Sequence, residues 1–270
     1  MLLSEVQKRQ KIVHRVRLDL THVYDTLCLL LGTEDTASEI ASMRGYTDSR
    51  MIRLLESKKI VKLPAFSDIQ LLMRTRGFQF TINDYRLMGL IGDDGGYWLQ
   101  DRYAIPLRSF DGYVIALVCW LPDNRKYITT GTLGFTSAST FFNMESYAKA
   151  AQFADGKTRV FVVEGIFDAL SIESLGYCCF GNEGLALSAV KKEMLSRFDN
   201  VYFIPDNDNP GRKSNKYLTQ FSSHHWDTPN GHLIRLTGAV KDMDDFVKRY
   251  SPANLNSLLT DSPYIKLEAK

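Results

Sequence analysis

The chain lacks the cysteine pattern of a zinc-binding protein. Its 270 residues include four cysteines, and no two of them form a CxxC pair. Structural zinc sites are commonly built from such pairs, so the sequence argues against a zinc ribbon. Cys178 and Cys179 are adjacent in an apolar stretch, and we interpret them as core residues of a protein in a reducing compartment.

Long apolar runs and processing signals are absent as well. No run approaches the roughly 18 apolar residues that a membrane-spanning helix needs, and no signal-peptide or transit-peptide pattern is present. We therefore expect a soluble cytoplasmic protein without a membrane partner. The P-loop pattern GxxxxGKS or GxxxxGKT is also missing, which leaves the chain without that kind of nucleotide motor.

An excess of charge of one sign is missing too. The sequence has 33 Lys and Arg residues against 31 Asp and Glu residues, a net charge of +2. Composition alone does not indicate nucleic-acid binding, so a binding surface would require uneven placement of charge. The first seventeen residues are uneven, and both a solvated helix face and a phosphate-binding face explain them: Lys8, Arg9, Lys11, Arg15 and Arg17 stand against Glu5.

What is present is ample apolar content, at 44% of the residues, enough for one large domain or two modest ones. Apolar residues at helical spacing predict a long helix from Ile12 to Gly32. Residues 35–60 predict two short helices split near Gly45, either a helical cap or a helix-turn-helix.

Helical and strand signals alternate in the next part of the chain. We expect helices at residues 67–76 and 81–87, the second capped by its first residue, a threonine. We expect strands at residues 97–99, 103–107 and 114–121, the last two joined by an Asp-Gly hairpin turn.

Two apolar runs that end in acidic residues give the strongest signal. They are Arg159–Val163 and Asn200–Ile204, and their length and residue types indicate strands buried on both faces. Between them we expect a helix after Gly165, a strand at 177–180 and a helix at 189–198. The order strand, helix, strand, helix, strand predicts an α/β fold with a doubly wound parallel sheet.

Acidic side chains follow these strands, where open parallel sheets bind their ligands. Two unit charges about 4 Å apart repel by roughly 4 kcal/mol at an effective dielectric constant of 20, so such a cluster favours a divalent cation. Mg²⁺ prefers oxygen ligands and is usually held by one or two carboxylates together with substrate phosphates. The acidic residues concerned are Glu164, Asp168, Asp206 and Asp208, and a third acidic patch with Asp242 and Asp244 follows the apolar run 232–236.

Other interpretations of the segment 206–211 explain it less well. A calcium-binding EF-hand loop does not fit, because Pro210 stands at its fifth position and Tyr217 replaces the terminal Glu. A helix cap accounts for one aspartate but not for two.

The acidic segments resemble the three signatures of the Toprim domain, which occurs in bacterial-type primases, topoisomerases and some nucleases. The matching segments are Glu164-Gly165, the DxDxxG pattern at 206–211, and Lys241–Asp244. The stretch 164–170 is most similar to the primase branch. Upstream, the segments 103–108, 112–117 and Lys126-Tyr127 resemble the stretch that precedes Toprim in bacterial and phage primases, so the resemblance covers roughly residues 76–250.

The resemblance implies a DNA-directed RNA polymerase that joins ribonucleoside triphosphates into short primers on single-stranded DNA, with Mg²⁺ or Mn²⁺ as cofactor. It implies catalytic roles for Glu164, Asp206 and Asp208, and metal binding by these residues with Asp168, Asp242 and Asp244. Contacts to nucleic acid or nucleotide are implied for Arg108, Lys126, Tyr127, Arg212 and Lys213. The expected parts are a helical region at 1–75, a mixed α+β subdomain at 76–150, a Toprim domain at 157–250 and a tail at 251–270.

Some positions depart from the primase pattern. Trp120 stands where such primases place an Arg, and residues 137–140 supply no lysine. Because a zinc ribbon and a P-loop are also missing, we expect weak binding to single strands, and a replicative helicase and a separate template-recognition factor as partners. A catalytic core that depends on separate partner proteins suits a phage or mobile element, and it would act in the host cytoplasm if it is phage-encoded.

Two other functions remain open. The same carboxylates could activate water in a metal-dependent nuclease. A catalytically inactive Toprim module that binds nucleic acid or associates with a helicase is the other alternative. Arg108 and Lys126 also have plain interpretations, as an arginine beside a turn and a lysine at the start of a strand. A topoisomerase is disfavoured, because the chain offers no room for a strand gate.

Overall fold

The computed structural model describes residues 4–122, 126–150, 156–182, 187–207, 231–234, 236 and 240–250, except for the side chains of residues 126 and 233. The chain divides into two compact units, Met1–Phe135 and Thr136–Lys270. The first unit combines the predicted helical region with most of the predicted mixed subdomain. No helix among the described residues is long and apolar enough to cross a membrane.

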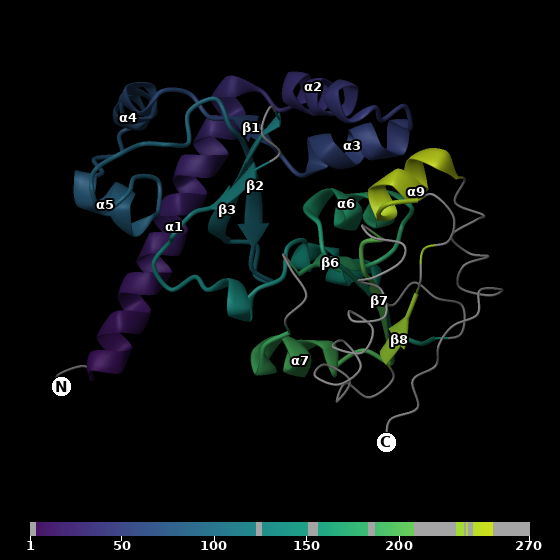
Figure 1. The fold of residues 1–270 in the computed structure, drawn as a ribbon. Coiled ribbons are helices and arrows are strands. Elements are labelled where there is room, and N and C mark those ends of the chain that lie inside the picture. The colour runs from purple at the N-terminus through teal and green to yellow at the C-terminus, as the bar shows by residue number, and fades with distance from the viewer. Residues whose placement is uncertain are drawn as a thin grey trace. The chain divides into compact units, whose positions relative to one another are not determined.

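A long helix, α1 (Glu5–Leu31), is the main element of the first unit (Figure 1). It begins with a capping box, in which Ser4 accepts a hydrogen bond from the amide of Gln7 and the Gln7 side chain accepts one from the amide of Ser4. Its buried stripe, from Val16 to Leu27, packs against the sheet of this unit. The shorter helices confirm the sequence prediction: α2 (Glu34–Arg44), α3 (Ser49–Ser57), α4 (Phe66–Thr75) and α5 (Ile82–Leu87).

The first sheet is antiparallel, with strand order β1-β2-β3-β4. Its strands are β1 (Val61–Lys62), β2 (Tyr103–Arg108), β3 (Val114–Leu121) and β4 (Lys126–Thr129). Gly112 has a φ of 85° in the β2–β3 turn, a conformation that favours glycine.

The predicted strand at residues 97–99 is wrong, because this segment has no strand partner. Trp98 is 58% exposed, and the hydroxyl of Tyr97 donates a hydrogen bond to the carbonyl oxygen of Pro64. This contact and hydrogen bonds from Arg102 to the carbonyl oxygens of residues 98 and 99 hold the segment without a strand ladder.

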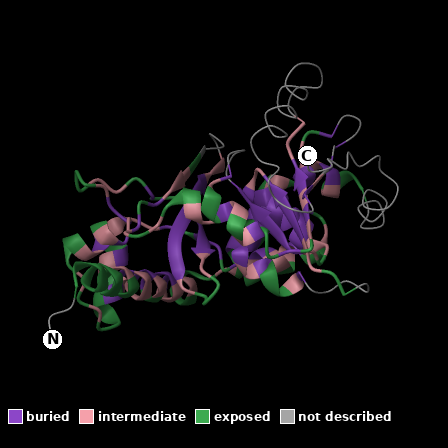
Figure 2. Cartoon of the chain, turned by 90° about the horizontal axis from the view of Figure 1, so that it is seen from below, coloured by how far each residue is buried: buried purple, intermediate pink, exposed green. Residues whose placement is uncertain are grey.

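The second unit is built on a parallel sheet with strand order β6-β5-β7-β8, which confirms the predicted α/β fold. Most side chains of the central strands β5 and β7 are aromatic or branched and are buried, as the purple colour in Figure 2 indicates. The strands are β5 (Arg159–Val163), β6 (Cys179–Gly181), β7 (Asn200–Ile204) and β8 (Gly231–Leu233). The helices are α6 (Ile166–Ser174), α7 (Ala189–Leu195) and α9 (Met243–Arg249), with 3-10 turns at Ser137–Ser139 and Met144–Lys149.

Candidate active site at the ends of the parallel strands

Glu164 and Asp206 meet at one edge of the parallel sheet. Strands β5 and β7 are neighbours in register, with Val163 opposite Ile204, so the residues that follow them leave the sheet side by side. The amide of Asp206 donates a hydrogen bond of 3.1 Å to Oε1 of Glu164. Both residues are only partly buried, so their carboxylates remain accessible to a ligand.

Asn207 connects this pair to the third acidic segment. Its amide donates a hydrogen bond of 2.6 Å to the carbonyl oxygen of Lys241, and its Nδ2 donates one of 3.0 Å to that of Val240. Asn207 was not predicted as a site residue, because an amide side chain between two acidic residues carries no distinctive sequence pattern. The three acidic segments are therefore adjacent in the folded chain.

Asp168 holds the beginning of α9. It lies in the first turn of α6 and is 7% exposed, and its Oδ1 accepts a hydrogen bond of 2.8 Å from the amide of Asp244. A Cβ at Gly165 would overlap the Asp168 carboxylate, so this approach requires glycine. In the Glu164-Gly165 pair, the glycine therefore leaves space for the Asp168 carboxylate, and the glutamate supplies the carboxylate of the candidate site.

Asp244 is also engaged. Only 4% exposed, it accepts hydrogen bonds from Oγ of Ser171, at 3.0 Å, and from Nζ of Lys248, at 2.8 Å. Its position in the first turn of α9 suits a negative charge, because the backbone amides there are partly positive. Lys248 was not predicted as this partner, although its i, i+4 spacing from Asp244 is a sequence signal for such a pair.

Asp242 begins the same helix. Its Oδ1 accepts a hydrogen bond of 2.8 Å from the amide of Asp245, and Nζ of Lys241 lies 3.4 Å from its Oδ2. Asp242, like Asp168 and Asp244, therefore has a structural role, whereas its metal-binding role stays a prediction.

The donor set fits a hard cation in part. Within the described part of the chain, no three acidic, histidine or cysteine side chains form a metal-binding group by themselves. Glu164 and Asp206 supply two carboxylates, which is the usual protein share for Mg²⁺ bound together with substrate phosphates. Asp208 lies outside the described residues, as do Arg212 and Lys213.

The other predicted contacts to nucleic acid or nucleotide lie in the first unit. Arg108 donates a hydrogen bond of 2.9 Å from Nη1 to the carbonyl oxygen of Gly112, and its Nη2 lies 3.4 Å from Oδ1 of Asp25. Its guanidinium therefore braces the hairpin turn against α1. Tyr127 is 44% exposed, and Lys126 begins β4, although the Lys126 side chain is outside the described part.

Trp120 clarifies one departure from the primase pattern. It is 3% exposed, and its ring centre lies 5.6 Å from that of Tyr103. The residue is part of the core, so its position does not present a side chain that binds phosphate.

Comparisons with known proteins agree with this geometry. Residues 161–247 match a family model described as Toprim-like, and no curated protein matches the chain. The RNA polymerase domain of the Mycobacterium tuberculosis primase DnaG is 18% identical, with a TM-score of 0.72 over 92% of this chain and 83% of that one. The Aquifex aeolicus primase, with its zinc-binding and RNA polymerase domains, is 22% identical, with a TM-score of 0.73 over 93% of this chain and 61% of that one.

A third solved structure, a DnaG primase catalytic domain bound to single-stranded DNA, is 19% identical. Its TM-score is 0.69 over 94% of this chain and 82% of that one. The chain thus has the fold of the catalytic core of bacterial primases, with a Toprim-like segment in its second unit. This finding confirms the fold that the acidic signatures predicted.

Proposed function

We propose that the chain is a DNA primase-like RNA polymerase, a nucleotidyltransferase that synthesises short RNA primers on single-stranded DNA for replication. The observation that carries the proposal is the contact between Glu164 and Asp206 at the ends of neighbouring parallel strands. The shared fold supports it, because the solved structures compared above contain primase catalytic or RNA polymerase domains, and one of them is bound to single-stranded DNA.

The proposed reaction is metal-dependent, because the resemblance to Toprim primases implies Mg²⁺ or Mn²⁺ and two carboxylates meet at this site. Glu164 and Asp206, together with Asp208, would hold Mg²⁺ or Mn²⁺. The bound cation would neutralise the triphosphate and lower the pKa of the attacking 3′ hydroxyl. Asp168, Asp242 and Asp244 are proposed as further ligands, in addition to their contacts within the protein.

The residues of this chain would organise the reaction by holding the carboxylates in place. The Asp206 amide fixes the direction of the Glu164 carboxylate, and Asn207 anchors the following loop to residues 240 and 241. Asp168 keeps the start of α9 against α6. Such prior ordering reduces the reorganisation that a reaction requires.

Template and nucleotide contacts are proposed for Arg108, Lys126, Tyr127, Arg212 and Lys213. We further propose a replicative helicase and a template-recognition factor as partners, because Trp120 and residues 137–140 supply no positive charge where the resemblance places it, and phosphate contacts dominate the binding of a template. This is consistent with a phage or mobile-element protein acting in the host cytoplasm.

Two alternatives use the same site differently. In a nuclease the carboxylates would activate water instead of a sugar hydroxyl. In an inactive Toprim module, nucleic acid or a helicase would bind without turnover.

A product assay distinguishes these functions. The protein is incubated with single-stranded DNA, the four ribonucleoside triphosphates (one of them labelled) and Mg²⁺. We expect labelled oligoribonucleotides that increase with time and require the DNA. Shortened DNA without new RNA would establish the nuclease instead, and two unchanged strands with retained binding would establish the inactive module.

A further inference from the structure

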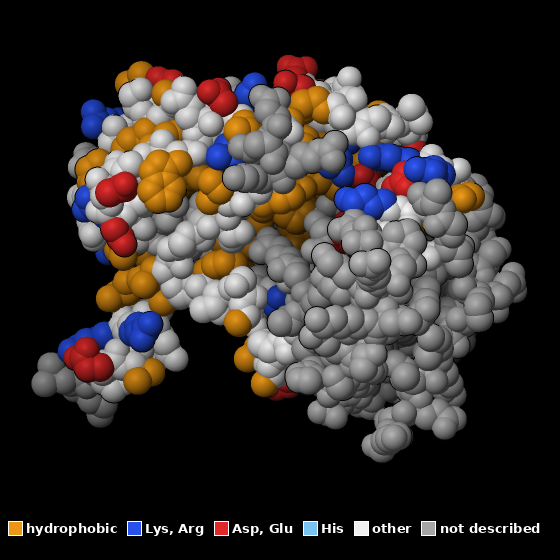
Figure 3. Space-filling view, in the orientation of Figure 1, with side chains coloured by type: hydrophobic (Ala, Val, Ile, Leu, Met, Phe, Trp, Pro, Cys, Tyr) orange, Lys and Arg blue, Asp and Glu red, His pale blue; other side chains and the backbone are white. Residues whose placement is uncertain are grey.

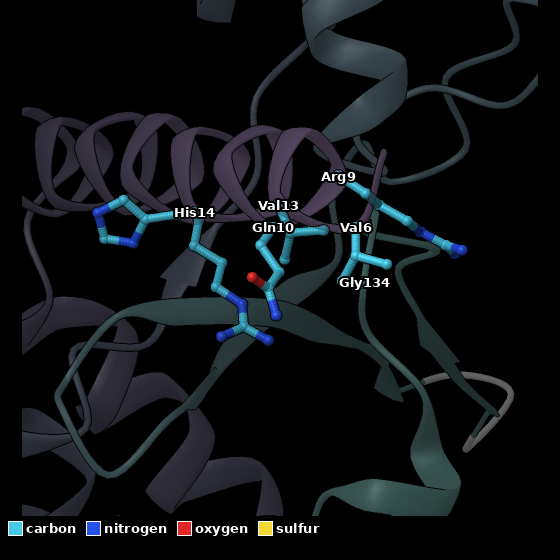
Figure 4. Close-up of a pocket in the computed structure, with 7 residues that line it drawn as sticks. Val6, Arg9, Gln10, Val13, His14 and Gly134 are labelled. Carbon is cyan, nitrogen blue, oxygen red and sulfur yellow. The ribbon is translucent and has the colours of Figure 1, made fainter. Parts of the chain in front are cut away.

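A groove runs along one side of the N-terminal half of α1. It has a volume of about 550 Å³ and is walled on the other side by the backbone of Gly134 (Figure 4). A Cβ at Gly134 would lie 2.6 Å from Cγ1 of Val13, and the φ of this glycine is +80°, so the close approach of this loop to α1 requires glycine. All of the lining residues belong to the first unit: Val6, Arg9, Gln10, Val13, His14, Arg17 and Gly134.

Most of the groove's exposed lining is apolar, but its charged side chains are all basic and no carboxylate lines it. Val6 and Val13 supply its apolar part, while Arg9 and His14 reach outward at opposite ends in Figure 4. The His14 ring is edge-on to that of Tyr113, with ring centres 5.6 Å apart. In Figure 3 the exposed N-terminal turns of α1 carry basic side chains on either side of an acidic patch.

The two arginines of the groove have no acidic partner within the described residues, whereas other cations of the same helix do. Lys8 pairs with Glu5 at 2.8 Å, and Arg15 pairs with Asp84 at 3.2 Å. Neither Arg9 nor Arg17 has a carboxylate oxygen within 4.0 Å in the described part of the chain. Their positive charge is therefore available to a ligand.

We propose that this groove binds the phosphodiester backbone of a single-stranded nucleic acid, with Arg9 and Arg17 on separate phosphates and Gln10 between them. Residues 9 and 17 are about 12 Å apart along a helix that rises 1.5 Å per residue. At about 3.4 Å per nucleotide in a stacked strand, this span corresponds to roughly three or four nucleotides. Guanidinium groups suit this ligand because they donate paired hydrogen bonds to phosphate oxygens.

An acidic peptide fits the groove less well. Protein interfaces concentrate their affinity in aromatic and other large anchors that fill desolvated pockets. This groove offers two valines as its large apolar side chains, and of its arginines Arg9 is exposed and Arg17 is partly buried. The choice of a nucleic acid also rests on the proposed polymerase function, which requires a single-stranded template.

The test compares two double variants that remove the same charge from different faces of α1. Arg9→Gln/Arg17→Gln removes the two arginine charges from the groove, whereas Lys8→Gln/Lys11→Gln removes two charges from residues that do not line it. Binding of a labelled oligothymidylate is measured by fluorescence anisotropy over a series of salt concentrations. Circular dichroism verifies the folding of each variant.

We expect the groove variant to bind about tenfold more weakly or worse, and the slope of log K against log salt to decrease by about 1.4. The slope follows from about 0.7 per phosphate contact for a single strand. The control should keep the slope of the original protein. A third variant, Gln10→Glu, should also weaken binding, because it adds one carboxylate to the groove on an exposed helical position.

Equal losses in the two double variants, or an unchanged slope in the groove variant, would overturn the proposal. Binding of labelled polyglutamate without binding of the oligothymidylate would overturn it too, in favour of an acidic peptide. The polymerase proposal fails separately. If the groove variant loses binding but the original protein makes no RNA, the groove remains a nucleic-acid site and the polymerase function is wrong.

Discussion

The two sheets of this protein use polar residues at strand ends in different ways. In the antiparallel sheet, Arg108 ends β2 and is engaged at once by the Gly112 carbonyl of the adjoining turn and by Asp25. In the parallel sheet, Glu164 and Asp206 follow neighbouring strands and meet although 42 residues separate them. Antiparallel neighbours place a strand end beside a local turn, whereas parallel neighbours gather distant residues at one edge. Strand direction therefore concentrates the acidic residues in the second unit.

The largest effect, on the rate of primer synthesis, is expected from removing the carboxylates of Glu164 and Asp206. Glu164→Gln/Asp206→Asn should lower the rate of primer synthesis by more than about 100-fold. Mutating a residue that only hydrogen-bonds to a metal ligand already lowers metal affinity or activity by about 10- to 100-fold, and this variant removes two proposed ligands. The melting temperature should stay unchanged or rise, since two repelling charges are lost. Primer extension assays and calorimetry measure the two effects.

Glu193→Gln is the matched control for this double variant, because Glu193 is an exposed carboxylate on α7 of the same unit. It should leave both primer synthesis and the melting temperature unchanged. Full activity of the double variant would show that the site lies elsewhere.

A smaller effect is expected where an acidic residue of this unit holds the fold. Asp168→Ala leaves the buried amide of Asp244 without its acceptor, and an unsatisfied buried group costs about 1–3 kcal/mol. Asp168→Asn keeps an acceptor oxygen and should recover much of this stability. Urea denaturation measures both variants, and equal stability of the original protein and the alanine variant would contradict the structural role of Asp168.

A smaller effect on stability is expected in the first unit, at the N-terminal cap of α5. This cap includes Asp84, an acidic residue with no proposed role in catalysis or metal binding. Thr81 caps α5, and Thr81→Ala should lower the free energy of unfolding by about 1 kcal/mol.

Hydrogen bonds from the Thr81 hydroxyl and amide lower the pKa of Asp84 below its usual value of 3.8. A lowered pKa in the folded state contributes stability above pH 3.8, and this contribution is lost as the pH falls through the lower folded value. The stability difference between the original protein and Asp84→Asn should accordingly shrink on acidification, as denaturation at neutral and acid pH would reveal.

The smallest signal, in the folded protein, is expected from the buried thiols. Burial raises the pKa of Cys119 in the first unit and of Cys178 in the second to about 12. Both thiols should therefore react very slowly with iodoacetamide at mildly alkaline pH, because the thiolate is the reactive form. In dilute denaturant, labelling rates at the two positions, compared by mass spectrometry, measure the opening of each unit. Rapid labelling of either thiol without denaturant would contradict its burial.

The parallel sheet was predictable because its strands are apolar on both faces and end in acidic or turn residues. Runs such as Val160–Val163 and Val201–Ile204 carry this signal within a few residues. The strand β1 was missed, since its two residues are too few for a periodic pattern and its partner β2 lies about forty residues later. The error at residues 97–99 has the opposite origin, an apolar triplet that pairs with no strand and is held by side-chain contacts and by the adjoining turn.

In the candidate site, the sequence predicted the convergence of Glu164 and Asp206 but not the supporting contacts. The pairing of Asp168 with the Asp244 amide depends on how α6 and α9 pack, which residue spacing does not specify. Asn207 acts through carbonyl oxygens of residues 240 and 241, which any residue type would provide. Such backbone acceptors leave no trace in a sequence.

The exposed beginning of α1 has a further consequence for dynamics. Residues 4–12 are exposed on every side and are ordered by the helix and its capping box, whereas Leu20 and Tyr24 are packed in the core. Turns without tertiary packing open more readily, so their amide hydrogens should exchange with deuterium much faster than those of the packed turns. Arg9 and Gln10 lie on these opening turns. A ligand that requires the helical form there would slow the exchange in proportion to its occupancy, which couples helix fraying to affinity.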